Sequence, residues 1–190
     1  MEAIVNLRTV YFLAAVAIFL VSLAALGIYY YFRGRKTSRG EWEDLLQRLV
    51  SVDRDHVALI ALDIIDETGA PRKDEEDTTL EPSQIWTLIG GLEGLERLER
   101  NCYVLIDMAF YVQQWYPEAL VVAELLRLNA REIAWHVSRL KGAAQTGNLE
   151  ASFPAYAQRA IATYYLMTRR VLTLYELGNL PMFVDLQKAL

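Results

Sequence analysis

The hydrophobic residues of this chain form two kinds of pattern, and the first is one uninterrupted apolar run. The segment VYFLAAVAIFLVSLAALGIYYYF covers residues 10–32 and contains neither a charged residue nor a proline. At about 1.5 Å of rise per residue, a helix of this length crosses a hydrocarbon core of about 30 Å. Tyrosine and phenylalanine stand near both ends, where aromatic rings favour the headgroup layer. The run therefore predicts a transmembrane helix over 10–32, preceded by a short tail at 1–9.

Beyond residue 40 the pattern changes, and apolar residues recur every three or four positions, as in amphipathic helices. We predict helices over 41–50, 54–67, 82–116 and 118–144, from Ser152 or Pro154 to Gly178, and over 181–190. Proline suits the first turn of a helix, and Pro82 and Pro154 take that place here. The segment 68–82, with Gly69, Pro71 and a run of charges, is the best candidate for a linker.

No stretch offers the long alternation of apolar and polar residues that a β-sheet needs. The sequence predicts an all-α protein, with one N-terminal transmembrane helix followed by a soluble antiparallel helical bundle over 41–190. The predicted helices 82–116, 118–144 and the one ending at Gly178 form the bulk of that bundle.

Basic residues follow the apolar run directly. Arg33, Arg35, Lys36 and Arg39 lie in a predicted juxtamembrane linker over 33–40, where they can contact anionic lipid. Lysine and arginine near a span resist translocation, so we expect the N-terminus outside and the domain in the cytoplasm, at the plasma membrane or a bacterial inner membrane. A cleaved signal peptide is the alternative. It is disfavoured because the apolar run exceeds the usual 7–15 residues and no small-residue cleavage site follows it.

The charge of the domain narrows the choice of partners. Residues 41–190 contain 23 acidic against 14 basic side chains, whereas binding to phosphate backbones needs a basic face. We therefore expect no nucleic-acid partner. The expected partners are membrane lipid and a protein, either another polypeptide or a second copy of this chain.

Two histidine-containing segments offer possible chemistry. Glu132 and His136 lie four residues apart on one helix face and could bind a metal together. Di-iron bundles instead use a Glu-x-x-His spacing of three, supplied twice, so a Glu–His hydrogen bond is favoured and no cofactor is expected. Asp53, Asp55 and His56 could suggest acid–base catalysis, but acidic residues at the start of a helix are typical of capping.

Three glycines and one carboxylate are unusual for their positions. Gly90, Gly91 and Gly94 fall within a predicted helix, where each costs about 1 kcal/mol relative to alanine. They indicate a kink, close packing or a groove for an apolar ligand.

Asp107 lies in an apolar segment near the core residue Cys102 and needs a cationic partner. The candidates, all on predicted helices, are Arg100, Arg131, Arg139, Arg159, Arg169 and Arg170.

No nucleophile–base pair, phosphate-binding loop or complete set of metal ligands is evident. The leading hypothesis is a membrane-tethered interaction, accessory or scaffolding module, which includes a role as a subunit of a larger membrane complex. Clustered aromatic and arginine residues at 113–117 and 164–170 fit either an interface or a bundle core. The alternatives are a small-ligand sensor using the three glycines and a metal-dependent enzyme using Glu132 and His136.

Overall fold

The structure is a computed structural model that describes residues 2–37, 42–72 and 79–190, with the backbone alone for 2–9 and 30–37. The chain divides into two units, residues 1–39 and 40–190, which are taken separately below.

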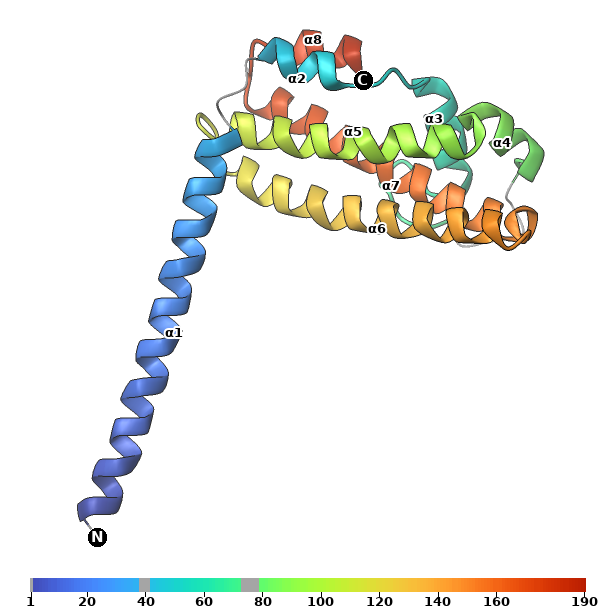
Figure 1. Ribbon diagram of the computed structural model, residues 1–190. Helices are drawn as coiled ribbons and strands as arrows, with labels where there is room; N and C mark the ends of the chain where they lie inside the picture. Colours follow the sequence, from blue (N-terminus) through green and yellow to red (C-terminus); the bar gives the residue numbers. More distant parts are fainter. Residues whose placement is uncertain (1, 38–41, 73–78) are drawn as a thin grey trace. The chain divides into compact units, whose positions relative to one another are not determined.

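The first unit is the single helix α1, Glu2–Thr37 (Figure 1). Within it, Val10–Tyr29 is long and apolar enough to cross a membrane. The helix extends past the predicted span at both ends, so the segments we expected as a tail and a linker are helical at 2–9 and 33–37. Arg33, Arg35 and Lys36 lie on this helix with side chains outside the described part, and Arg39 lies outside the described residues altogether.

The second unit is a helical bundle, and its described residues contain no strand, so the predicted all-α class is confirmed. Its helices are α2 (Trp42–Arg48), α3 (Arg54–Ile64), α4 (Pro82–Ile89), α5 (Gly91–Val112), α6 (Ala119–Gln145), α7 (Leu149–Leu177) and α8 (Phe183–Ala189). The three long helices α5, α6 and α7 run antiparallel to their chain neighbours and form the core, as predicted (Figure 1). The shorter helices cover it, with α2 on α5, α3 and α8 on α7, and α4 on both α5 and α7.

The predicted helix 82–116 is two helices, which corrects the sequence interpretation. Gly90 (φ 79°) and Gly91 (φ 64°) adopt left-handed backbone conformations and turn the chain between α4 and α5. Residues that carry a side chain rarely adopt this backbone conformation, which explains why glycine stands at both positions. The helix also ends at Val112, several residues before the Pro117 that we expected to stop it.

Two further boundaries differ from the prediction. The helix α7 begins at Leu149, so Pro154 lies inside it rather than at its start. The helix α3 ends at Ile64, because Ile65 becomes extended and pairs with Pro71. The carboxylate of Asp66 then accepts hydrogen bonds from both the backbone and hydroxyl of Thr68, which closes a turn at the start of the predicted linker.

Two buried polar side chains fasten distant segments to the bundle. The amide of Asn101 on α5 accepts a hydrogen bond from the Val50 backbone N–H and donates one to the Val50 carbonyl, each at 2.8 Å, and donates a third to the Tyr164 hydroxyl. The carboxylate of Asp63 on α3 accepts hydrogen bonds from the backbone N–H and the hydroxyl of Thr79, both at 2.8 Å. These contacts satisfy polar groups that would otherwise be costly to bury.

Candidate functional site

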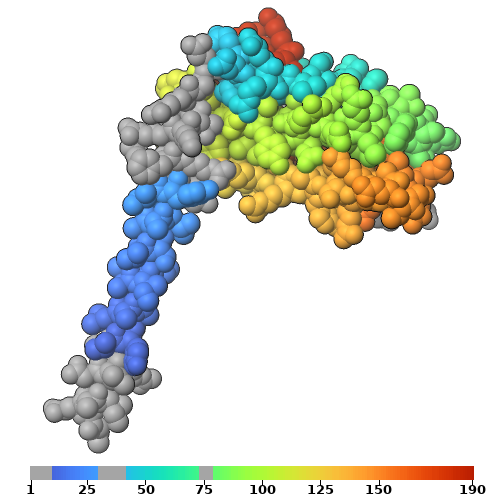
Figure 2. Space-filling view, in the orientation of Figure 1, coloured from blue at the N-terminus to red at the C-terminus, as the bar shows by residue number. Residues whose placement is uncertain are grey.

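The outward face of α6 carries a row of exposed apolar side chains. Val121, Leu125, Leu128 and Trp135 are spaced by four, three and seven residues, which places them on one side of the helix. Their exposed fractions are 64%, 43%, 59% and 49%. We call these four residues the α6 seam. Figure 2 shows α6, in yellow to orange, at the surface of the domain.

The opposite side of α6 makes the expected core contacts with α5 and α7. Its buried residues are Ala119, Ala123, Leu126, Ala130, Ile133, His136, Val137 and Leu140. Because this second stripe already anchors α6 in the bundle, the α6 seam is apolar surface that the described chain leaves in solvent. Full burial of a large aliphatic side chain is worth about 1.5–3 kcal/mol. Burial of the α6 seam against a partner would therefore contribute favourable free energy to association.

Several other helices of the domain each expose one large apolar residue. Examples are Leu59 on α3, Trp86 on α4, Tyr103 on α5 and Val184 on α8. Scattered residues of this kind are normal on protein surfaces, whereas contiguous apolar patches mark contact sites. The α6 seam is of the second kind.

A groove of about 520 Å³ between α6 and α7 borders the first half of the seam. It is lined by Glu67, Thr68, Gly69, Tyr116, Glu118, Val122, Leu125, Leu166, Arg169, Arg170, Thr173, Leu174 and Leu177. Leu177 is 67% exposed, and the guanidinium of Arg169 lies 5.7 Å from the centre of the Tyr165 ring. The groove thus widens the apolar surface from α6 onto α7.

A second groove, of about 640 Å³, lies at the other end of the seam. Trp135 lines it together with Arg139 and Tyr156. The Arg139 guanidinium lies 5.2 Å from the Trp135 ring centre, and the Tyr156 ring meets Trp135 edge-on at 5.6 Å. Tryptophan and arginine in this arrangement are typical of energetically important interface residues.

The exposed charges along α6 are unevenly distributed. Glu118 is exposed at the start of the helix, whereas Arg131 and Arg139 are exposed in its second half. Glu124 is already engaged by Arg127, whose guanidinium lies 2.5 Å from the carboxylate. The outward face therefore carries the acidic Glu118 at its N-terminal end and the basic Arg131 and Arg139 toward its C-terminal end. Glu132 lies between these two arginines in the sequence.

Glu132 and His136 lie together as their spacing suggested, with 3.7 Å between Glu132 Oε1 and His136 Nε2. The imidazole is 3% exposed and contacts the rings of Trp135 and Tyr156, at 5.0 and 5.6 Å between centres. Burial lowers the pKa of His136 below its ordinary value, an effect that Glu132 partly opposes. In the described part of the chain no group of three potential ligands forms, whereas zinc sites use three or four protein ligands.

Gly90, Gly91 and Gly94 lie at the corner between α4 and α5, where Gly91 and Gly94 pack against residues of α4. A Cβ atom on Gly91 would lie 2.7 Å from the indole of Trp86, and one on Gly94 would overlap the backbone carbonyl of Ile89. A Cβ on Gly90 would meet open space, so its left-handed φ of 79° is the constraint there. The corner requires glycine for backbone conformation and close packing, and neither requirement involves a ligand.

Asp107 forms an ion pair, as predicted, but both its partner and its burial differ from the prediction. Its side chain is 29% exposed rather than buried, and its carboxylate pairs with Arg48 of α2 at 2.6 Å, not with any of the six arginines we considered. The packing of α2 against α5 creates this contact, and helical periodicity carries no information about it. Cys102 is buried among the core residues of α5 as expected, and burial raises the pKa of its thiol.

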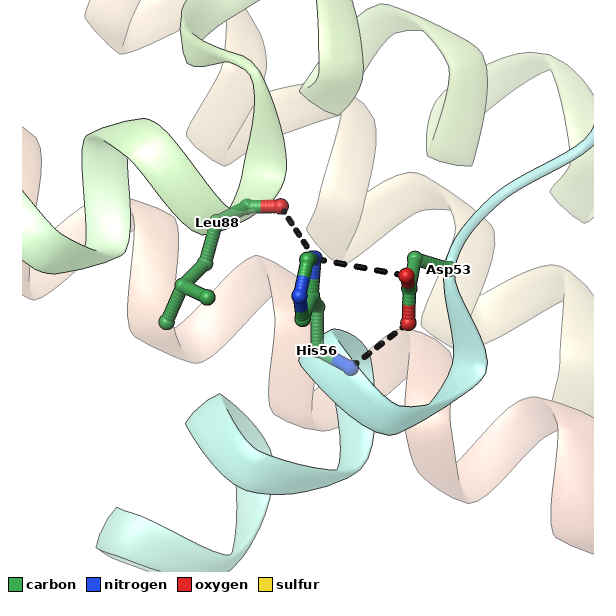
Figure 3. Close-up of polar contacts among 3 residues, drawn as sticks. All are labelled: Asp53, His56 and Leu88. Atoms are coloured by element: carbon green, nitrogen blue, oxygen red, sulfur yellow. Dashed lines mark hydrogen bonds and ion pairs between the residues drawn. The ribbon is translucent and has the colours of Figure 1, made fainter.

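Asp53 caps α3, as the sequence indicated (Figure 3). Its carboxylate accepts a hydrogen bond from the His56 backbone N–H at 3.0 Å. The imidazole Nδ1 of His56 lies 3.1 Å from the Leu88 carbonyl oxygen and 3.6 Å from the Asp53 carboxylate. The cluster joins the start of α3 to the end of α4, so its hydrogen bonds serve the fold.

Sequence reasoning missed the α6 seam because helical spacing alone does not separate Val121, Leu125 and Leu128 from the core residues of α6. A signal for the seam was present, since the apolar residues of this helix form two stripes on different faces. Comparison with protein-family models, with curated proteins and with solved structures finds no match to this chain.

Proposed function

We propose that the protein is a single-pass membrane protein that presents its helical bundle in the cytoplasm as an interaction or scaffolding module. The contact surface in this proposal is the α6 seam, and its occupant is a helix of another polypeptide chain. The observation that carries the proposal is the exposure of four large apolar side chains in one row on a helix that is already anchored by a different stripe.

The dimensions of the seam favour a helix as the occupant. Its residues follow the alternating spacing of three and four that lines a helix–helix contact, with Glu132 filling the place between Leu128 and Trp135. Polar side chains flank the row, because Glu124, Asn129 and Arg131 lie beside it. A narrow apolar stripe with polar borders matches the geometry of packed amphipathic helices.

Attachment to a membrane supports the same role. The apolar segment Val10–Tyr29 and the basic residues after it provide the anchor and its contact with anionic lipid. An anchored module meets anchored partners at raised local concentration, so a modest seam suffices for association. The small-ligand sensor and the metal-dependent enzyme remain alternatives. At Gly91 and Gly94 an added Cβ would meet Trp86 and the backbone of Ile89, and among the described residues no third potential ligand joins Glu132 and His136.

The test is site-specific photo-crosslinking in the membranes of expressing cells. A photoreactive side chain at Leu128 should form a discrete crosslinked product, and Leu128→Glu should prevent co-isolation of the crosslinked polypeptide. Leu59 on α3 is the matched control, because it is a leucine of similar exposure (53% against 59%) outside the seam. Equal crosslinking at both positions, or none at Leu128, would refute the seam as the contact surface.

A further inference from the structure

We infer that the helix received by the α6 seam is the α6 of a second copy of this chain, packed antiparallel. This inference rests on the proposed function, because it takes the seam as the contact surface and identifies its occupant. Such a contact has two-fold symmetry, so each residue of the seam meets a surface of the same protein.

The arrangement of the seam about its midpoint fits self-pairing. Leu128 lies seven residues from both Val121 and Trp135. With the two-fold axis near Leu128, an antiparallel partner places the small Val121 of one copy against the large Trp135 of the other. The two Leu128 side chains meet at the axis, and Leu125 of one copy lies beside the exposed Glu132 of the other. Small residues therefore face large ones at the two outer positions, as in well-packed helix contacts.

The charge pattern selects the antiparallel direction. The same axis brings Glu118 of one copy beside Arg139 of the other, and symmetry repeats the pair. A parallel arrangement would instead set Glu118 beside Glu118 and Arg139 beside Arg139. Both side chains lie in exposed positions at opposite ends of α6. The dipoles of two antiparallel helices also oppose one another favourably.

A charge-swap experiment on the full-length chain tests this pairing. The wild-type protein and its variants are labelled with donor and acceptor dyes, reconstituted into vesicles, and assayed for energy transfer over a series of protein-to-lipid ratios. Glu118→Arg and Arg139→Glu should each weaken self-association about 2- to 30-fold, because each change removes two symmetry-related exposed ion pairs. The double variant should recover the wild-type value, because it restores both pairs with reversed sign.

Crosslinking gives a second, independent measurement. Leu128→Cys should yield a disulfide-linked dimer under a mild oxidant, because the axis brings the two cysteines together. Leu59→Cys is the matched control and should stay monomeric, and native Cys102 is buried and needs no replacement. Absence of the Leu128→Cys dimer, together with a wild-type chain that shows no energy transfer above dilution controls, would overturn the inference.

The outcomes also separate this inference from the proposed function. If the double variant fails to recover association, or only Arg139→Glu has an effect, the seam does not pair with itself. The second pattern points to an anionic lipid surface or an acidic partner. If Leu128 still crosslinks to a different polypeptide, the proposed function holds and only self-pairing fails. If Leu128 crosslinks to nothing, both fail together.

Discussion

Alanine substitutions at the corner between α4 and α5 should separate two roles of glycine, close packing at Gly94 and a left-handed backbone conformation at Gly90. Gly94→Ala would place a Cβ atom on the backbone carbonyl of Ile89, and a carbonyl at the end of a helix cannot move without disturbing its neighbours. Overpacking of this kind costs about 1–3 kcal/mol. Gly90→Ala meets open space but must adopt a φ of 79°, at a cost of about 1–2 kcal/mol.

Gly142 is the matched control for these changes. It lies in α6 with ordinary helical backbone and nothing within 4 Å of an added Cβ. Gly142→Ala should therefore stabilise the fold by about 0.5–1 kcal/mol through helix propensity. The three variants should thus differ in sign as well as in size, which a uniform effect of alanine cannot produce.

Tryptophan fluorescence during thermal unfolding of the detergent-solubilised chain can measure these differences. All four tryptophans lie beyond residue 41, so the signal reports the bundle and not α1. For a domain of this size, 1 kcal/mol corresponds to about 2–4 °C in melting temperature. Gly94→Ala and Gly94→Leu should both melt lower than the wild-type chain. If Gly94→Ala melts higher, as Gly142→Ala should, the corner geometry described above is wrong.

Three further predictions concern topology, acid sensitivity and a buried carboxylate. A reporter fused after Leu190 should give a cytoplasmic signal, and activity on the other side of the membrane would reverse the orientation. Because burial lowers the pKa of His136, the unfolded chain binds a proton first as the pH falls through about 6.5, so acid lowers stability. His136→Phe should flatten the slope of unfolding free energy between pH 7 and pH 5, and an unchanged slope would exclude this residue as its source. Asp63→Ala should destabilise the bundle by about 1–3 kcal/mol in urea unfolding, because two hydrogen bonds from Thr79 to the buried carboxylate are lost, while an effect below about 0.5 kcal/mol would show that water replaces the carboxylate.

Periodicity was enough to predict the all-α class and the three long helices. Helices α5, α6 and α7 have strong apolar stripes, and their spacing is enough to identify each as a helix with a buried face. Helix ends were harder to predict. The break at Gly90 depends on a left-handed backbone that a glycine permits but does not impose, and propensity could not distinguish it from a helix with three glycines.

The contacts of the polar residues could not be predicted, because they join segments far apart in sequence. Arg48 pairs with Asp107 across 59 residues, and Asn101 bonds to Val50 across 51. Periodicity describes one helix at a time and carries no information about which short helix covers which part of the core. The α6 seam was missed for a different reason. Its residues are recognisably apolar in the sequence, but placing them on the surface requires knowing that α6 has neighbours on one side only.

The bond between Asn101 and the Val50 backbone has a consequence for mechanical load. A pull on the apolar helix α1 would reach the bundle through the chain that enters it at α2. Trp42 and Leu45 hold α2 in place by burial, and Trp42 also contacts the rings of Tyr111 and Tyr175. Such a force would therefore detach α2 first and then load the hydrogen bonds between Val50 and Asn101, which pass the tension directly to α5 in the core.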